Sequence, residues 1–277
     1  MVSLLELDRL TFGYEADNTL LKDVSLTLSR GESVGIVGDN GSGKSTIIKL
    51  LLGLHHPIDG DVKLFNKKVT WNNHYPGLSY IGDPSYNPGE LGLPTGFLVS
   101  EVMDTFKLIW ETNGISCSDS LEDCLEIQSF RNTRVSQLSK GQRMRLMAFL
   151  ALSKPTDLLL ADEATEGLDR DGKSAVLSAV KEAARKQKFG ILWISHRRDE
   201  VALIAQKVYE LKNGSLKQQK MTRFNCQITT NHGSSKGENK SKNRKLCREG
   251  VFQALGEILT DASVLDFTIQ GGQDLEE

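Results

Sequence analysis

The segment at residues 38–46, G-D-N-G-S-G-K-S-T, constrains this chain more than any other stretch of its 277 residues. It fits the pattern G-x-x-x-x-G-K-[ST], in which glycines let the backbone curl until its N–H groups surround phosphate oxygens. Residues 33–37 before it predict a buried strand, and the apolar run after it predicts a helix whose positive end faces the same phosphates. Strand, glycine loop and helix together predict a phosphate-binding site rather than a fortuitous glycine turn.

Charged and polar side chains within and beyond this loop suit nucleotide chemistry. Lys44 places a positive charge at the β- and γ-phosphates, and the Ser45 hydroxyl is a ligand for Mg²⁺. Asp162 and Glu163 end an apolar run that predicts a buried strand, and carboxylates at such strand ends lie where ligands bind in α/β sheets. Asp162 therefore fits a residue that holds Mg²⁺, and Glu163 one that polarises the attacking water as a general base. The alternative is a solvated acidic turn.

Two further features stand at the ends of predicted elements. Residues 138–142, L-S-K-G-Q, precede a strongly helical run, so Ser139 and Gly141 lie at a helix N-terminus, which is a ready anion site. Because the glycine loop already has its own helix N-terminus, a second phosphate-binding helix start in the same chain needs a second surface to act on. His196 follows another buried strand and is placed to bond the γ-phosphate; the alternative is a structural histidine.

Composition bounds the class of protein. Hydrophobic residues make up 39% of the chain and charged residues 25%, which is ordinary for a soluble globular protein. No apolar run reaches the roughly 18 residues that a membrane span needs, and the chain enters a strand pattern at once, without the features of a signal peptide. The four cysteines form no C-x-x-C pair, so the sequence predicts reduced thiols, with neither a zinc site nor a disulfide framework.

The net charge of −2 is spread unevenly over three segments, which carry −4, +8 and −6: residues 1–211, 212–250 and 251–277. The basic segment lacks interleaved aromatics, so a solvated tether is favoured over a segment that binds lipid headgroups or nucleic acid. The asymmetry predicts three parts of the chain: a main domain at 1–215, a basic polar linker at 216–248 and a small acidic extension at 249–277.

Taken in order along the chain, these motifs resemble those of the ATP-binding subunit of the ATP-binding-cassette (ABC) superfamily, over about residues 3–215. Tyr14 lies where that family places an aromatic ring that stacks on adenine, although a strand-end tyrosine is the alternative. The matching segments are residues 38–46 for Walker A, 138–142 for the ABC signature, 157–163 for Walker B, 166–169 for the D-loop and 195–196 for the H-loop.

The resemblance implies an α/β fold: a P-loop NTPase of the ABC type, with a central, mostly parallel sheet, an N-terminal antiparallel β-subdomain and an inserted α-helical subdomain at about residues 95–137. It implies an Mg²⁺-dependent ATPase, an integral membrane permease as partner, and a second cassette, either a copy or a homologue, in a head-to-tail dimer. It places the chain in the cytoplasm, peripheral on the cytoplasmic face of the cell membrane. Nucleic acid is not an expected partner.

The resemblance also implies roles for individual residues. Lys44, Glu163 and His196 are the expected catalytic residues. Those expected to bind ATP are Tyr14, Gly38, Asp39, Asn40, Gly41, Ser42, Gly43, Lys44, Ser45 and Thr46. Those of the signature, which act across the dimer, are Leu138, Ser139, Lys140, Gly141 and Gln142, with Asp169 in the D-loop. The expected Mg²⁺ ligands are Ser45, Asp162 and Asp83.

The sequence departs from the family pattern at three places. Lys140 replaces the first glycine of the signature pair, a position that tolerates change. The glutamine expected before the helical subdomain is missing near Gly82, where Asp83 is the nearest candidate for a bond to Mg²⁺ or its water. Ala164 and Glu166 replace the common proline and serine after the catalytic glutamate, which leaves the chemistry intact but changes the contacts of the D-loop.

Transport is the function that the motifs favour, because the helical insertion is where the family docks its membrane partner. A soluble ABC-type ATPase acting on the ribosome or on DNA is the alternative. Translation-acting members resemble two fused cassettes, and chromosome- and repair-type members carry long coiled coils, but here no sustained heptad lies between Thr46 and Leu138. A small-molecule P-loop kinase would not explain L-S-K-G-Q. The C-terminal end weakly resembles that of drug- and polysaccharide-exporting ATPases, which favours export over import.

Overall fold

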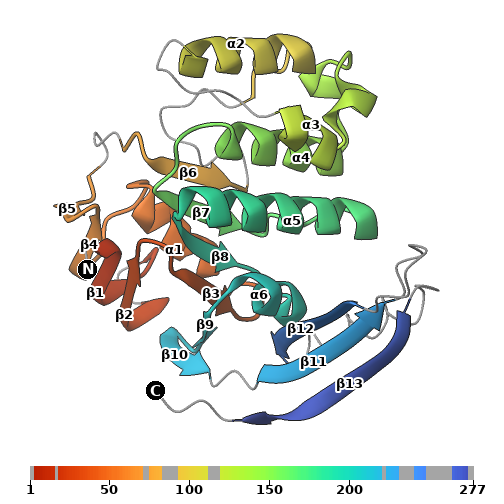
Figure 1. Ribbon diagram of the computed structural model, residues 1–277. Helices are drawn as coiled ribbons and strands as arrows, with labels where there is room; N and C mark the ends of the chain where they lie inside the picture. The colour runs from red at the N-terminus through yellow and green to blue at the C-terminus, as the bar shows by residue number, and fades with distance from the viewer. Residues whose placement is uncertain are drawn as a thin grey trace, which may run out of the picture.

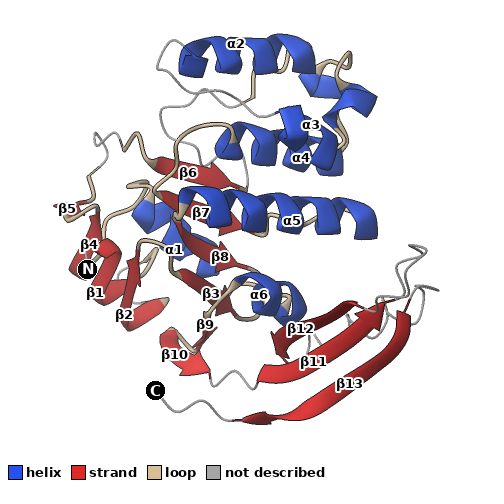
Figure 2. Cartoon of the chain, in the orientation of Figure 1, coloured by secondary structure: helices blue, strands red, loops and turns tan. Residues whose placement is uncertain are grey.

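The computed structural model describes residues 3–15, 18–70, 75–82, 93–111, 119–219, 223–230, 240–247 and 264–273. Within this part of the chain the strands form three sheets, which are drawn as red arrows in Figure 2. The largest sheet lies in the middle of the molecule, and Figure 1 shows helices stacked over it. The architecture is the α/β fold that the sequence predicts.

The central sheet is mostly parallel and has the strand order β10-β9-β3-β8-β7-β6. Only the β9–β10 pair of this sheet, within the described residues, is antiparallel. All residues of β3, β7 and β8 are buried, as expected of parallel strands that are covered on both faces. The strands are β3 (Ser33–Val37), β6 (Leu78–Ile81), β7 (Leu158–Asp162), β8 (Gly190–Ile194), β9 (Lys207–Lys212) and β10 (Ser215–Gln219).

The second sheet is antiparallel and has the order β2-β1-β4-β5. In β2, buried leucines and valines alternate with exposed polar residues over most of its length, because only one face of this sheet packs on the core. This is the N-terminal antiparallel β-subdomain that the sequence predicts. Its strands are β1 (Ser3–Phe12), β2 (Leu21–Ser29), β4 (Asp59–Leu64) and β5 (Lys67–Lys68).

The helices include a group inserted between β6 and β7, where the sequence predicts a helical subdomain; Figure 1 shows α2 as its outermost helix. No helix of the described residues combines the length and apolar character that a membrane-spanning segment needs. The helices are α1 (Lys44–Leu51), α2 (Val99–Glu111), α3 (Asp119–Cys124), α4 (Lys140–Leu152), α5 (Arg170–Gln187) and α6 (Arg198–Ile204), with 3-10 turns η2 (Ile127–Phe130) and η3 (Val135–Gln137).

Successive residues of the central strands point into two different hydrophobic cores. Leu159 and Ala161 of β7 pack into the core that contains residues of α2, α4 and α5, whereas Leu158 and Leu160 pack into the core shared with α1 and the N-terminal sheet. This alternation follows from the two-residue repeat of a strand. The central sheet is therefore clamped between two apolar layers, and its strand ends are the rigid positions on which a site can be built.

The C-terminal part differs from the sequence prediction. The central sheet continues past residue 215, because β10 pairs with β9 as far as Gln219. Two strands, β11 (Arg223–Thr230) and β12 (Lys240–Cys247), fall inside the segment predicted as a polar linker, and β13 (Val264–Gln273) joins them in an antiparallel sheet of order β12-β11-β13. The high polarity of this segment masked the alternation F-x-C-x-I at its start, which is typical of a strand.

Gly35 in β3 generates a prediction about how closely α6 approaches the central sheet. A Cβ atom on Gly35 would lie 2.1 Å from Cγ1 of Val201 and 2.9 Å from Cβ of Ala205. Gly35→Ala should therefore lower the free energy of unfolding by about 1–3 kcal/mol, the usual cost of overpacking a core, measured by urea denaturation. Gly96→Ala is the control, because no atom lies within 4 Å of its added Cβ. Equal denaturation midpoints for the two variants would contradict this close approach.

Candidate nucleotide-binding site

The glycine-rich loop leads directly from β3 into α1, as the sequence predicts. Gly41 and Gly43 adopt φ angles of 79° and 103°, in the left-handed region that favours glycine. Gly43 is the N-cap of α1, so the loop delivers the chain to the helix start with the positive end of the helix facing the loop. A backbone curled in this way presents consecutive N–H groups to an anion.

Lys44 is held inside the loop rather than extended into solvent. Its side chain is buried, and Nζ donates hydrogen bonds of 2.8 Å to the carbonyl oxygens of Gly38 and of Asp39. The loop's own carbonyl groups therefore keep a positive charge at its centre. Any anion that the loop binds meets this charge together with the N–H groups of the loop.

A cavity of about 320 Å³ lies against this loop. It brings together Tyr14, the candidate for stacking on adenine, most of the glycine loop, and the catalytic candidates Glu163 and His196 from the strand ends. Gly38, Asp39 and Ser42, which the sequence also predicts as ATP-binding, do not line it. Its lining residues are Tyr14, Leu20, Asn40, Gly41, Gly43, Lys44, Ser45, Thr46, Glu163, Glu166 and His196.

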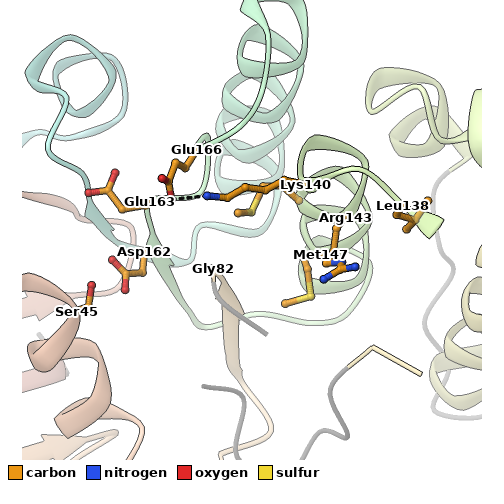
Figure 3. A pocket seen from close by; sticks show the side chains of 10 residues that line it. Ser45, Gly82, Leu138, Lys140, Arg143, Met147, Asp162, Glu163 and Glu166 are labelled. Carbon is orange, nitrogen blue, oxygen red and sulfur yellow. Dashed lines mark ion pairs between the residues drawn. The ribbon is translucent and has the colours of Figure 1, made fainter. Parts of the chain in front are cut away.

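A neighbouring cavity of about 480 Å³ connects the glycine loop with the signature segment. Figure 3 shows Ser45 and Asp162 on one side of this cavity and Leu138 on the other. Arg143 of α4 also lines it, although sequence reasoning did not single out this residue. The cavity is lined by Ser45, Gly82, Leu138, Lys140, Arg143, Met144, Met147, Asp162, Glu163 and Glu166; Ser139, Gly141 and Gln142 of the signature are not among them.

Tyr14 presents an aromatic ring at the mouth of the first cavity. Its side chain is 57% exposed, and its hydroxyl group forms a 3.1 Å hydrogen bond with Oγ1 of Thr46. The ring packs edge-to-face on Phe12 and His55, with centroids 5.2 and 5.4 Å apart. Burial, followed in size by the charge of Lys49, lowers the pKa of His55, so the His55 ring that packs on Tyr14 is neutral at neutral pH. An anchored, exposed ring of this kind is suited to stack on a planar base.

Glu163 and His196 are bonded to each other, which sequence reasoning did not predict. Oε2 of Glu163 lies 2.9 Å from Nδ1 of His196 and accepts a 3.1 Å hydrogen bond from the Ser195 hydroxyl. Oε1 accepts a 2.9 Å hydrogen bond from the backbone N–H of His196. The carboxylate therefore fixes the orientation of the imidazole. Both groups line the cavity of about 320 Å³ at the glycine loop, called the phosphate-loop cavity below.

The oxygen groups at the base of the site suit Mg²⁺. Asp162 is the buried last residue of β7, and its carboxylate lines the same cavity as the Ser45 hydroxyl. Hard oxygen donors of this type are the ligands that Mg²⁺ prefers, with phosphate oxygens and water completing its shell. Within the described residues no group of three or more His, Cys, Asp or Glu side chains gathers as a metal site. Asp83, the third predicted ligand, lies outside the described residues.

The signature segment begins a helix, as predicted. Ser139 is the N-cap of α4, and its hydroxyl accepts a 3.2 Å hydrogen bond from the backbone N–H of Gln142. The Gln142 side chain accepts a 3.0 Å hydrogen bond from the N–H of Ser139 in return, which completes a capping box. Gln142 therefore stabilises the helix start, and the remaining free N–H groups of the first turn are those that point out of the helix end.

Two of the departures from the family pattern contact each other. Nζ of Lys140 lies 3.0 Å from Oε2 of Glu166, and the ion pair is drawn as a dashed line in Figure 3. The stem of Lys140 also packs over Gly167, where a Cβ would lie 2.9 Å from Cδ of Lys140. The signature segment is thereby joined to the D-loop of the same chain. Because the two side chains are 61% and 53% exposed, the pair contributes at most about 1 kcal/mol to stability.

Asp169 of the D-loop has a structural partner within the chain. It is the N-cap of α5, and its Oδ1 accepts a 2.8 Å hydrogen bond from the N–H of Gly172. The same oxygen lies 3.4 Å from Nη2 of Arg145, a residue of the signature helix α4. The D-loop is therefore tied to α4 by two contacts: Asp169 with Arg145, and Glu166 with Lys140.

Comparison with known proteins assigns the chain to a family. The family model described as ABC transporter matches residues 21–166. The energy-coupling factor transporter ATP-binding protein EcfA of Enterococcus faecium is 31% identical over 224 residues, which cover 78% of both chains. EcfA1 of Streptococcus sanguinis is 30% identical, again over 78% of both chains.

Solved structures show the same fold. The structure of an ATP-binding subunit of an ABC transporter has a TM-score of 0.66 and 25% identity, covering 78% of this chain and 89% of its own. A dimeric ATP-binding cassette bound to ADP and Pi has a TM-score of 0.62 and 22% identity, covering 78% and 97%, which supports the fold alone.

The chain therefore belongs to the ABC transporter family, as the motifs predict. It is an ATP-binding subunit of the ABC type and an ATPase. The relatives do not support the export direction that the C-terminal end of the sequence suggested, since they are named as energy-coupling factor transporter proteins. They also do not favour a soluble ATPase acting on the ribosome or on DNA.

Proposed function

We propose that this chain powers a membrane transporter by Mg²⁺-dependent hydrolysis of ATP, as one half of a head-to-tail dimer on the cytoplasmic face of the membrane. The observation that carries this proposal is the cavity at the glycine loop. Its wall combines the Lys44 charge with the bonded pair of Glu163 and His196. A cation for phosphates, a carboxylate base for the attacking water and an imidazole thus meet at one place.

The residues around this cavity divide the chemistry between them. The loop N–H groups and Lys44 bind the phosphates, and Ser45 and Asp162 would hold Mg²⁺, which neutralises phosphate charge when bound. Glu163 accepts a proton from the attacking water as the water oxygen bonds to the γ-phosphorus. The bond from that phosphorus to the β–γ bridging oxygen breaks, releasing ADP and phosphate. His196 is bonded to the Glu163 carboxylate and lines the same cavity, where it would contact the γ-phosphate of bound ATP.

Hydrolysis by Glu163 can be tested with an isosteric variant. Glu163→Gln keeps the shape of the side chain and removes its basicity, so it should bind ATP yet turn over at least about 100-fold more slowly. Steady-state phosphate release and ATP affinity are the measurements. Lys44→Ala should instead fail at nucleotide binding or at stabilisation of the γ-phosphate. Near wild-type turnover in Glu163→Gln would show that another group is the base.

The positions of two helix starts support the proposal of a dimer. Ser139 begins α4, which packs into one hydrophobic core, whereas the glycine loop begins α1, which packs into the other core with the N-terminal sheet. Figure 3 places Leu138 and Ser45 on opposite sides of the intervening cavity. In this arrangement we expect no single phosphate to contact both helix starts of one chain. A two-fold related cassette, a second copy or a homologue, brings the signature of one chain over the phosphates held by the other.

The dimer can be tested in the Glu163→Gln background, where bound ATP persists. This variant should dimerise with ATP and not without it in sedimentation velocity, because each charge-assisted bond from the signature contributes about 1.5–3 kcal/mol. Adding Ser139→Asp keeps a good helix cap but places a carboxylate against the phosphates, so dimerisation should disappear while the thermal midpoint is retained. A chain that stays monomeric at saturating ATP would contradict the homodimer and leave only a partner cassette.

A membrane subunit is the partner that the helical part suits best. The apolar side chains of Phe97, just before α2, and of Leu108 and Ile109, within α2, are 54%, 64% and 48% exposed. They lie on the part of the fold where the family docks its permease. The relatives' names as transporter proteins support the same assignment.

Leu108 provides the test of docking. Leu108→Glu should remove the chain from the membrane fraction of its own host, because a buried glutamate is costly at an apolar interface. The ATPase activity of the isolated chain should stay unchanged. Thr105→Glu is the matched control, since Thr105 is an exposed polar residue of the same helix. Equal membrane recovery of both variants and the wild type would exclude α2 as the docking element.

A further inference from the structure

Glu200 is a buried carboxylate that belongs to none of the sequence motifs. It lies on α6 with its side chain 4% exposed, and it lines neither of the two cavities described above. Its Oε1 is 2.9 Å from Nε of Arg197 and 3.2 Å from Nζ of Lys173, and its Oε2 accepts a hydrogen bond from the Thr165 hydroxyl. A carboxylate this deeply buried persists only when it is paired and hydrogen-bonded.

The partners of Glu200 flank the two catalytic candidates. Thr165 is two residues after Glu163, and Arg197 directly follows His196. The loops are also joined nearer the cavity, because the Ser195 hydroxyl donates to Glu163 and accepts a 3.1 Å hydrogen bond from the N–H of Arg197.

These contacts form a closed ring. It runs from Glu163 through Ser195 and Arg197 to Glu200, and then through Thr165 back along the chain to Glu163. Glu200 closes the ring by linking Arg197 to Thr165. Its place is fixed by α6, whose next residue, Val201, packs against Gly35 of β3.

Glu163 needs such support because its backbone is strained. Its φ angle is 48°, in the left-handed region that a residue with a side chain rarely adopts. Such a conformation persists only where the surrounding contacts over-determine it. The N–H of Glu163 donates a 2.9 Å hydrogen bond to the carbonyl of Ile194, and the carbonyl of Glu163 accepts a 2.8 Å hydrogen bond from the N–H of Glu166. The two bonds to His196 and the ring through Glu200 add restraints on the side chain and on the neighbouring loops.

We propose that Glu200 is a positioning residue for ATP hydrolysis: its carboxylate holds the loops after β7 and β8 so that Glu163 and His196 stay bonded at the phosphate-loop cavity. This inference rests on the proposed role of Glu163 as the base. Lys173 provides an internal comparison. It contacts the same oxygen of Glu200, but it comes from α5 and is not part of the ring.

The experiment compares kcat and KM for ATP in variants of the full chain. Thr165→Val keeps the shape of a buried side chain and removes only the hydroxyl bond to Glu200. Glu200→Gln removes the charge. Both should lower kcat about 10-fold or more with KM nearly unchanged, because a small displacement of a reacting group is costly. The double variant should be no slower than the slower single variant, since both changes interrupt the same ring of contacts.

Lys173→Met is the matched control. It removes a charge that pairs with the same carboxylate but leaves the ring intact, so kcat should stay within about twofold of the wild type. The ¹⁵N resonances of the His196 ring, which report its bond to Glu163, should shift in Thr165→Val and not in Lys173→Met. If Glu200→Gln fails to fold because it strands two cations, Thr165→Val still decides, since it removes no charge.

Glu163→Gln is measured in the same series to separate the two proposals. If it retains turnover, the assigned base is wrong, whatever the Glu200 variants do. If it is slow while Thr165→Val and Glu200→Gln turn over like the wild type, the positioning role alone is wrong. An equal loss of kcat in Thr165→Val and Lys173→Met would also overturn that role, because the effect would then not follow the ring.

Discussion

The site depends on the register of two neighbouring parallel strands. β7 and β8 pair Asp162 with Ile194, so the residues that follow each strand emerge side by side at one edge of the sheet. Glu163 and His196 are bonded because of this pairing. A slip of one residue would turn every side chain of β7 to the other face and separate the pair. Both strands are fully buried, and apart from Asp162 their side chains are apolar, so packing on both faces of the sheet resists such a slip.

The order of the strands extends the same edge to the phosphate loop. β3 lies on the other side of β8, and its register pairs Ile36 with Ile194. The loop after β3 therefore emerges beside the loop that carries His196, which in turn lies beside the one that carries Glu163. Phosphate-binding, imidazole and carboxylate groups from three distant parts of the sequence are thus brought into one row. α6 packs against the strands that carry this row: its Val201 lies against Gly35 of β3, and its Glu200 pairs with Arg197 after β8.

The sequence was sufficient for features that are local. Apolar runs ending at Asp162-Glu163 and at Ser195-His196 predicted β7 and β8, and the segment L-S-K-G-Q before a helical run predicted the start of α4. It did not reveal the Glu163–His196 bond or the role of Glu200, because these contacts depend on strand order rather than on spacing along the chain. The linker prediction at 216–248 was wrong about β11 and β12, since high polarity outweighed a short alternating pattern. Family resemblance, rather than composition, supplied the signature and its action across a dimer.

The ion pair of Lys140 and Glu166 explains two departures from the family pattern with one contact. Glu166 lines both cavities, so its carboxylate alone would repel the phosphates of a bound nucleotide. Lys140, at 3.0 Å, offsets that charge. The exposed pair adds little stability, so its effect is on the local charge rather than on the fold. A lysine and a glutamate that face each other leave this edge of the site neutral, as do the glycine and serine that the family pattern has at these two positions.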